Sequence, residues 1–218
     1  MSALAAVLFD MDGTLVDTEV LWWDVTAEVA AGLGHTLADA DAPEVVGRAV
    51  EDTAAHLVRV SGGGDPDRDR VAADLTERFF RRVAAGAPLR PGAGRLLTEL
   101  SAQGVPFALV SASPRSVVDS VVGGALCGVP FAFTLSADDT PRTKPHPEPY
   151  RAAAARLGAA PEACVAVEDS PDGAASAEAA GCGVLVVPSL LDVAVSPARS
   201  FARSLEDVTL DVLRDCLV

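Results

Sequence analysis

Residues 9–17 read FDMDGTLVD and follow directly on an apolar run, LAAVL, at residues 4–8. An apolar run without alternation is typical of a parallel strand that is covered on both faces. Side chains two residues apart in an extended segment point the same way, so Asp10 and Asp12 can address one point at the carboxyl end of this strand. Ligands bind beyond that end in open α/β sheets. An Asp-rich turn is the alternative interpretation, since Asp and Gly are common turn residues.

The rest of the chain alternates between apolar runs and helical patterns. Strands are predicted at residues 4–9, 105–110, 131–135, 164–167 and 183–187. Helices are predicted between them, at about 91–103, 114–122, 147–157 and 171–180, mostly with proline near the start and glycine near the end. Strands that alternate with helices of this length predict an α/β fold with a doubly wound parallel sheet.

Residues 18–88 depart from this alternation, because they contain helical patterns but no convincing strand. We expect helices at 18–33, 49–60 and 66–85, with a turn at Ser61–Gly64. The predicted organisation is an α/β core domain of residues 1–17 and 89–218, with an inserted helical cap domain of residues 18–88. Since the insertion directly follows the two acids, we expect it to cover the site; a packing extension without a chemical role is the alternative.

The composition indicates a globular, strongly acidic chain. Its 218 residues are 50% hydrophobic with a mean hydropathy of +0.29, enough to bury a sizeable core. The 17 Lys and Arg against 31 Asp and Glu give a net charge of -14, which opposes binding to nucleic acid and to anionic membranes. No basic leader or membrane-spanning apolar run is evident, so we expect a cytoplasmic protein. The 4 cysteines lack CxxC spacing, which indicates buried, reduced thiols.

A second polar motif, Ser111-Ala-Ser-Pro114, follows the strand predicted at 105–110. The hydroxyl of Ser111 and nearby amides can hold a phosphoryl oxygen beside a helix N-terminus. Ser113 fits the N-cap position of the next helix, and capping alone would explain one serine.

A third motif, Thr143-Lys-Pro-His-Pro147, places Lys144 in a loop whose prolines restrict the backbone. Such a loop fixes the direction of the ammonium group. A simply solvated lysine is the alternative. We expect His146 to be a loop residue and not a base.

A fourth motif places Glu168 and Asp169 at the end of a buried strand, directly before Ser170 and Pro171. Adjacent buried acids are costly unless a cation is present. Mg²⁺ typically takes one or two protein carboxylates plus water and substrate phosphate, a requirement that Asp10 and Asp169 meet. An ordinary helix cap is the alternative interpretation of Asp169.

Taken in order, DxDGT, Ser, Lys-Pro and Glu-Asp resemble the motifs of the haloacid dehalogenase-like superfamily, specifically its phosphatases with a helical cap after the first motif. The resemblance spans nearly the whole chain, because residues 136–150 (SADDTPRTKPHPEPY) and 167–181 (VEDSPDGAASAEAAG) also look like the sugar-phosphate branch. It implies a Rossmann-like core and a Mg²⁺-dependent phosphomonoester hydrolase.

The resemblance also implies catalytic roles. Asp10 would be the nucleophile that forms an aspartyl-phosphate, and Lys144 would neutralise charge between nucleophile and substrate. Asp12 would protonate the leaving alcohol and later activate water. That role requires the pKa of Asp12 to lie well above the ordinary value of about 3.9.

Further residues would bind metal and phosphate by the same resemblance. Mg²⁺ would be held by Asp10, the main-chain carbonyl of Asp12, and Asp169, with Glu168 at or just outside that shell. The phosphate would contact the group Ser111, Ala112, Lys144, Gly13 and Thr14.

The expected substrate is a small phosphorylated metabolite, a hexose phosphate in particular. A β-phosphoglucomutase-type phosphotransferase is the nearest alternative, and a non-catalytic phosphate-binding regulatory protein is an alternative of another class. The mutase branch carries a histidine in the first cap helix, where this chain has Trp22, and basic residues around the glycine that matches Gly47, where only Arg48 is basic. Hydrolysis therefore ranks first.

Four cap residues are expected to face the substrate: Glu19, Trp22, Trp23 and Arg48. Packing of an amphipathic helix explains the two tryptophans equally well. The expected partner is a small phosphorylated molecule, without nucleic acid or membrane, and a monomer is the default.

Overall fold

The computed structural model describes residues 4–46, 48, 50–61, 67–189 and 191–217. The chain divides into two compact units, which we call the core unit (residues 1–17 and 88–218) and the cap unit (residues 18–87). Pro88, which the sequence placed in the insertion, falls in the core unit. Its carbonyl oxygen accepts a hydrogen bond from the Asp17 amide at 2.9 Å, which ties it to the end of the first segment.

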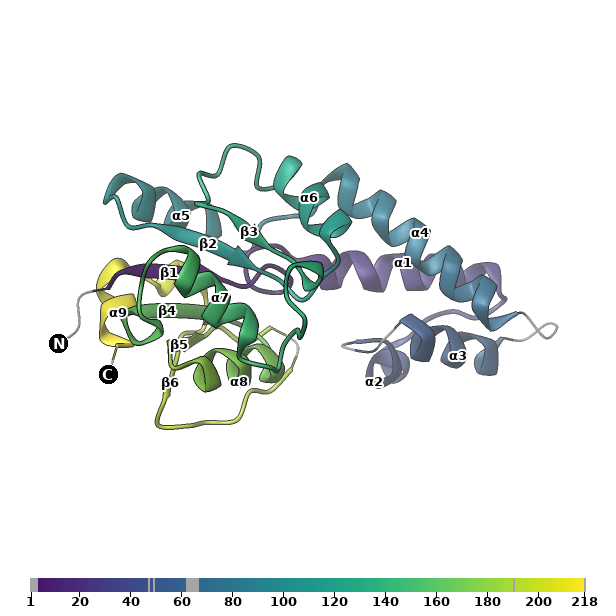
Figure 1. The fold of residues 1–218 in the computed structure, drawn as a ribbon. Coiled ribbons are helices and arrows are strands. Elements are labelled where there is room, and N and C mark those ends of the chain that lie inside the picture. Colours follow the sequence, from purple (N-terminus) through teal and green to yellow (C-terminus); the bar gives the residue numbers. More distant parts are fainter. Residues whose placement is uncertain (1–3, 47, 49, 62–66, 190, 218) are drawn as a thin grey trace. The chain divides into compact units, whose positions relative to one another are not determined.

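The described strands of the core unit form one six-stranded sheet, parallel throughout, in the order β3-β2-β1-β4-β5-β6 (Figure 1). Their bounds are β1 (Ala6–Phe9), β2 (Phe107–Val110), β3 (Thr134–Leu135), β4 (Cys164–Glu168), β5 (Gly183–Val186) and β6 (Arg199–Phe201). The predicted doubly wound α/β fold is confirmed. β6 was not predicted, and β3 is shorter than the predicted strand, because both lie at sheet edges where little apolar burial is needed.

Helices cover the central strands. Those of the core unit are α5 (Ala93–Ala102), α6 (Arg115–Gly123), α7 (Glu148–Arg156), α8 (Pro171–Ala180) and α9 (Leu210–Asp215). α7 and α8 pack against the sheet through small side chains such as Ala153 and Ala177, in one buried cluster with Leu8 and Ala166 of the strands. Small residues allow the helices to approach the strands closely. α9 was not predicted, because its six residues carry too few positions for a periodic pattern.

The described part of the cap unit is helical, with α1 (Thr18–Gly32), α2 (Ala42–Val45), α3 (Val50–Val60) and α4 (Arg68–Gly86). Val25 and Val29 of α1, Leu57 of α3 and Leu75 of α4 belong to its own buried core. Each unit therefore has a separate apolar centre. Ala49, Pro66 and the turn residues from Gly62 to Gly64, all included in the predicted elements, lie outside the described residues.

The cysteines, all of which the structure describes, form no disulfide bond. The 4 cysteines are free; three are buried as predicted, whereas Cys127 is exposed, since it lies in the turn after α6. Across the described residues, no helix combines the length and apolar character that crossing a membrane requires.

Candidate active site

The candidate site lies at the carboxyl edge of the sheet. β1 is between β2 and β4, with Phe9 in register with both Leu109 and Val167. The chain order of the strands reverses between β1 and β4, which is where doubly wound sheets bind ligands. The residues that end or follow these three strands therefore emerge together: Asp10, Ser111, Glu168 and Asp169.

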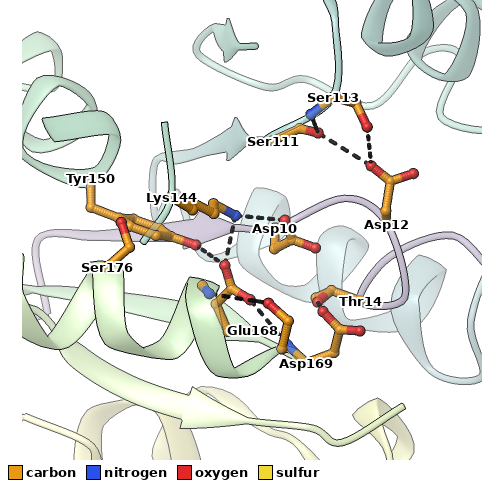
Figure 2. A network of polar contacts seen from close by, with 12 residues as sticks. Asp10, Asp12, Thr14, Ser111, Ser113, Lys144, Tyr150, Glu168, Asp169 and Ser176 are labelled. Atoms are coloured by element: carbon orange, nitrogen blue, oxygen red, sulfur yellow. Dashed lines mark hydrogen bonds and ion pairs between the residues drawn. The ribbon is translucent and has the colours of Figure 1, made fainter. Parts of the chain in front are cut away.

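Lys144 joins two of these acids. Its Nζ lies 2.6 Å from Asp10 Oδ1 and 2.6 Å from Glu168 Oε1, and its side chain is only 4% exposed. The predicted fixed ammonium is thus seen, as an ion pair bridging the ends of β1 and β4 (Figure 2). A buried charge of this kind persists only when it is paired and hydrogen-bonded, so the solvated alternative does not hold for Lys144.

Burial and the neighbouring charges shift the pKa values of Asp10 and Lys144. Burial raises the pKa of Asp10 to about 7; Lys144 opposes the rise, and the nearby Glu168 and Asp12 add to it. Burial lowers the pKa of Lys144, but the adjacent Asp10 and Glu168 carboxylates more than offset this, so the group stays cationic. An additional cation near Asp10 would lower the pKa of its carboxyl group and keep it ionised at neutral pH.

Asp12 faces a different set of partners. Its Oδ2 accepts hydrogen bonds from Ser113 Oγ at 2.7 Å and from Ser111 Oγ at 3.3 Å (Figure 2). The predicted cap role of Ser113 is wrong, since Pro114 occupies the N-cap position of α6 and the hydroxyl of Ser113 turns to Asp12 instead. The two acids of the first motif are therefore held separately, Asp10 by an amine and Asp12 by hydroxyl groups.

The predicted phosphate-binding residues lie around these acids, and several are engaged locally. The Gly13 amide donates to the Val16 carbonyl at 2.8 Å, and Thr14 Oγ1 donates to Asp169 Oδ1 at 3.3 Å. Ala112 is exposed at the start of the loop between β2 and α6. Phosphate contact by these groups stays a prediction.

An acid cluster that could hold a metal is present. Asp10, Glu168 and Asp169 each offer a carboxylate oxygen within 4.8 Å of the others. Asp10 Oδ2 is buried and has no hydrogen-bond partner among the described residues, which is costly unless a further cation or donor binds there. Gly13 leaves room beside Asp169, because a Cβ at Gly13 would lie 2.1 Å from Asp169 Oδ2. These oxygens fit a hard cation such as Mg²⁺.

The cap of α8 and the contacts of Glu168 differ from two sequence-based expectations, namely that Asp169 caps the helix and that Glu168 lies at the metal. Ser170, and not Asp169, caps α8 by accepting a hydrogen bond from the Gly173 amide. Both oxygens of Glu168 already have donors within the protein, so its contacts favour a counter-ion for Lys144; metal ligation by Glu168 stays a prediction.

Two residues at the site were not predicted. Ser113 was assigned to capping, and Tyr150 was not singled out, although its hydroxyl donates to Glu168 Oε1 at 2.5 Å. A hydroxyl at the far end of a buried aromatic side chain is the signal that could have identified Tyr150, since such a group needs an acceptor.

The predicted substrate residues Glu19, Trp22, Trp23 and Arg48 all belong to the cap unit. Trp22 is used in packing there: its Nε1 donates to the Val45 carbonyl at 3.0 Å, and its ring meets that of Phe79 edge to face at 5.5 Å. Arg48 Nε donates to the Pro43 carbonyl at 3.0 Å. Contact of these four side chains with a substrate stays a prediction.

The parallel sheet, with its acid–lysine–acid arrangement at the carboxyl edge, belongs to a class of hydrolases that comparison with known families identifies. The family model described as haloacid dehalogenase-like hydrolase matches residues 4–181, so the chain belongs to this family. Several relatives are named as phosphatases, and the chain is an enzyme of this phosphatase class.

Individual relatives narrow the branch. Hexitol phosphatase B of Escherichia coli (strain K12) is 32% identical over 187 residues, which cover 85% of this chain and 84% of that protein. Protein CbbY of Rhodobacter capsulatus is 33% identical over 207 residues, covering 85% and 86%. Both agree with the sugar-phosphatase branch of the family.

Solved structures show the same architecture. CbbY from Rhodobacter sphaeroides, in complex with xylulose-(1,5)bisphosphate, superposes with a TM-score of 0.74 at 26% identity, covering 96% of this chain and 99% of that one. A haloacid dehalogenase family hydrolase from Deinococcus radiodurans with bound phosphate and sodium gives 0.73 at 32% identity, covering 86% and 83%. These two similar proteins thus hold a sugar bisphosphate and a phosphate ion, respectively.

Proposed function

We propose that this protein is a Mg²⁺-dependent phosphomonoester hydrolase that acts on a small sugar phosphate of the hexose or hexitol type, through an aspartyl-phosphate at Asp10. The observation that carries the proposal is the state of Asp10: one oxygen is paired with Lys144, and the other is buried without a partner among the described residues. A carboxylate with one oxygen anchored by an ammonium group and the other without a hydrogen-bond donor keeps a lone pair for nucleophilic attack.

The reaction proceeds in two displacements. A carboxylate oxygen of Asp10 attacks phosphorus, the bond to the substrate oxygen breaks, and Asp12 gives its proton to the departing alkoxide. Asp12 then takes a proton from water, whose oxygen attacks the phosphoryl group and releases inorganic phosphate with Asp10 regenerated. The hydroxyls of Ser111 and Ser113 hold one oxygen of Asp12, which orients the group for both proton transfers.

Charge is the main obstacle to the first step, since an anionic carboxylate must approach a phosphoryl group that already carries nearly two negative charges. Lys144 neutralises Asp10 on one side. Asp10, the main-chain carbonyl of Asp12, and Asp169 would hold the Mg²⁺. When bound, the ion supplies positive charge that offsets the repulsion between the carboxylate and phosphate oxygens.

The relatives support the substrate class. Two hexitol phosphatases of Escherichia coli, each 32% identical, match most of this chain. A mutase is the second candidate, but the position where mutases carry a gating histidine is Trp22, which packs within the cap unit. Hydrolysis therefore remains the preferred reaction, by a monomer as the default state.

The test is release of inorganic phosphate from hexitol 6-phosphates, hexose 6-phosphates and a pentulose bisphosphate, after removal of metal and after addition of Mg²⁺. Asp10→Asn should lose activity by at least about a thousandfold, whereas Asp172→Asn, an exposed acid on α8, should match the parent. Metal-independent turnover, or an active Asp10→Asn, would contradict the mechanism. Accumulation of glucose 6-phosphate from β-glucose 1-phosphate would favour the mutase.

The covalent step has its own readout. p-Nitrophenolate leaves without needing a proton, so Asp12→Asn should still be phosphorylated by p-nitrophenyl phosphate but should hydrolyse the adduct slowly. Intact-mass measurement after acid quench should then show one phosphoryl group on the Asp12→Asn protein and none on Asp10→Asn. A phosphoryl group on Asp10→Asn would rule out Asp10 as its attachment point.

A further inference from the structure

Both carboxylate oxygens of Glu168 are hydrogen-bonded within the protein. It is fully buried at the end of β4. Its Oε1 accepts from Lys144 Nζ at 2.6 Å and from Tyr150 Oη at 2.5 Å, and its Oε2 accepts from the Asp169 amide and Ser170 Oγ, both at 3.2 Å. These donors fix the orientation of the carboxylate, which is one of the two that Lys144 contacts.

Tyr150 contributes to this arrangement twice. The residue is fully buried on α7, and its hydroxyl is one of the two donors to Glu168 Oε1 (Figure 2). The Lys144 Nζ also lies 5.1 Å from the centre of its ring, within the range of a cation–π contact. A phenylalanine would fill the same apolar space among the alanines of the cluster, so packing alone does not explain a phenol here.

Gly173, in the first turn of α8, borders the Glu168 carboxylate. A Cβ at this position would lie 2.0 Å from the Glu168 carboxylate. The first turn of α8 therefore makes space for the carboxylate at a helix N-terminus, where negative charge is favoured. Displacing Glu168 is not a cheap rotation, because four hydrogen bonds hold it in a fully buried position.

We propose that Tyr150 is a positioning residue: its hydroxyl and ring fix Glu168 and Lys144 together, so that the ammonium group stays on Asp10. Tyr150 touches neither Asp10 nor the reacting atoms in any contact described, so its effect on turnover passes through Glu168 and Lys144. The kinetic part of this inference rests on the proposed phosphatase function, whereas the position of Lys144 does not.

The kinetic test is a double-mutant cycle of Tyr150→Phe and Glu168→Gln. Tyr150→Phe should lower kcat by about tenfold or more, as removal of an outer partner of a catalytic group commonly does, with little change in KM. In the Glu168→Gln background the same change should cost less than about twofold, because coupled residues are not additive. Equal losses in both backgrounds would overturn the proposal. Leu213→Ala, a fully buried change on α9, is the control for lost packing alone and should leave kcat at the parent value.

The second test needs no turnover. Lys144 is the only lysine in the chain, so an amine-acylating reagent has one side-chain target, which peptide mapping separates from the N-terminus. In the metal-free protein, Tyr150→Phe should speed acylation of Lys144 several-fold, because the ammonium group leaves its carboxylate partners more often. Gly173→Ala should do the same, since the added methyl displaces Glu168.

Leu213→Ala should label at the parent rate. Unchanged labelling in both Tyr150→Phe and Gly173→Ala would show that neither residue positions Lys144. If no phosphate ester is turned over but labelling responds as expected, the proposed function fails and the positioning role stands.

Discussion

Lys144 shows how much a single side chain carries at this site. Every other basic side chain in the sequence, histidine aside, is an arginine. A lysine ammonium is a compact charge that can sit between two carboxylates, whereas the planar guanidinium of arginine binds them through a wide fork. With Nζ at 2.6 Å from both Asp10 and Glu168, the site is built for the smaller cation.

Replacing Lys144 by methionine should therefore destabilise the core unit by about 3–5 kcal/mol, because two buried carboxylates lose their shared cation. Urea unfolding followed by circular dichroism would measure the loss. The Lys144→Met/Asp10→Asn double variant should recover part of it, since one of the unpaired charges is gone. A single variant as stable as the parent would mean that the buried ion pair contributes nothing to the fold.

Gly13 matters to the site because it has no Cβ. It has φ of +78°, a region that other L-residues avoid, and an added Cβ would meet the Asp169 carboxylate. Gly13→Ala should raise the Mg²⁺ concentration needed for half-maximal activity by about tenfold or more. Gly158→Ala is the matched control, since Gly158 has φ of +67° and nothing within 4 Å of the added carbon.

The control should lose only about 1–2 kcal/mol of stability from backbone strain and keep the parent's response to Mg²⁺. A Mg²⁺ titration of activity together with urea unfolding separates the two effects. If both alanine variants respond to Mg²⁺ alike, the space beside Asp169 has no part in metal binding.

Among the elements of the cap unit, a buried acid joins the short helix of residues 39–41 to α3. Asp41 Oδ2 accepts from the Ala38 amide at 2.9 Å and lies 3.1 Å from His35 Nε2, while its Oδ1 lies 2.7 Å from His56 Nε2. These contacts, with the Ala38 amide the largest contributor, lower the pKa of Asp41 from 3.8 to about 2. A folded-state pKa below the unfolded value means that this carboxylate stabilises the cap unit above about pH 4 and that the contribution disappears as the pH falls through about 2.

Asp41→Asn should accordingly lower the free energy of unfolding of the cap unit by about 2 kcal/mol at pH 7. Both tryptophans of the chain lie in α1, so their fluorescence in urea reports on this unit. The difference from the parent should shrink below pH 4, and Asp39→Asn, an exposed acid on the same turn, should differ little from the parent at any pH. A difference that stays constant with pH would show that the charge of Asp41 is not its source.

The elements also show what the sequence can predict. Long apolar runs and proline-to-glycine helix patterns located β1, β2, β4, β5 and the helices α5 to α8, because burial on both faces leaves a strong signal. Short edge elements such as β6 carry no such signal. The site residues that end strands were predicted by position, but Tyr150 was not, since its acceptor comes from β4 and only the folded chain brings the two together. Ser113 fitted capping because the Ser-Pro sequence is typical of a helix start.

At the scale of the whole molecule, the net charge of -14 should slow the approach of an anionic substrate. Added salt shortens the Debye length from about 30 Å at 0.01 M to about 8 Å at 0.15 M, which screens this repulsion. We expect kcat/KM for a sugar phosphate to rise by about two- to fivefold over that range, with kcat unchanged. Initial rates in NaCl and in KCl would measure it; a fall in kcat/KM would show that local positive charge at the site governs the encounter.

The chain segments that lead into and out of the cap unit contact each other within the core unit. Val16 and Leu89 form an antiparallel bridge, the Arg90 amide donates to the Leu15 carbonyl at 2.9 Å, and Arg90 lies 3.7 Å from the Asp17 carboxylate. These contacts join the two ends of the insertion to each other within the core unit. The path of the chain from β1 to α5 is therefore held by core-unit residues and does not depend on the length or sequence of the insertion. We therefore expect that another relative's insert can replace residues 18–87 without moving a strand, with the junctions of such a chimera at Asp17 and Pro88.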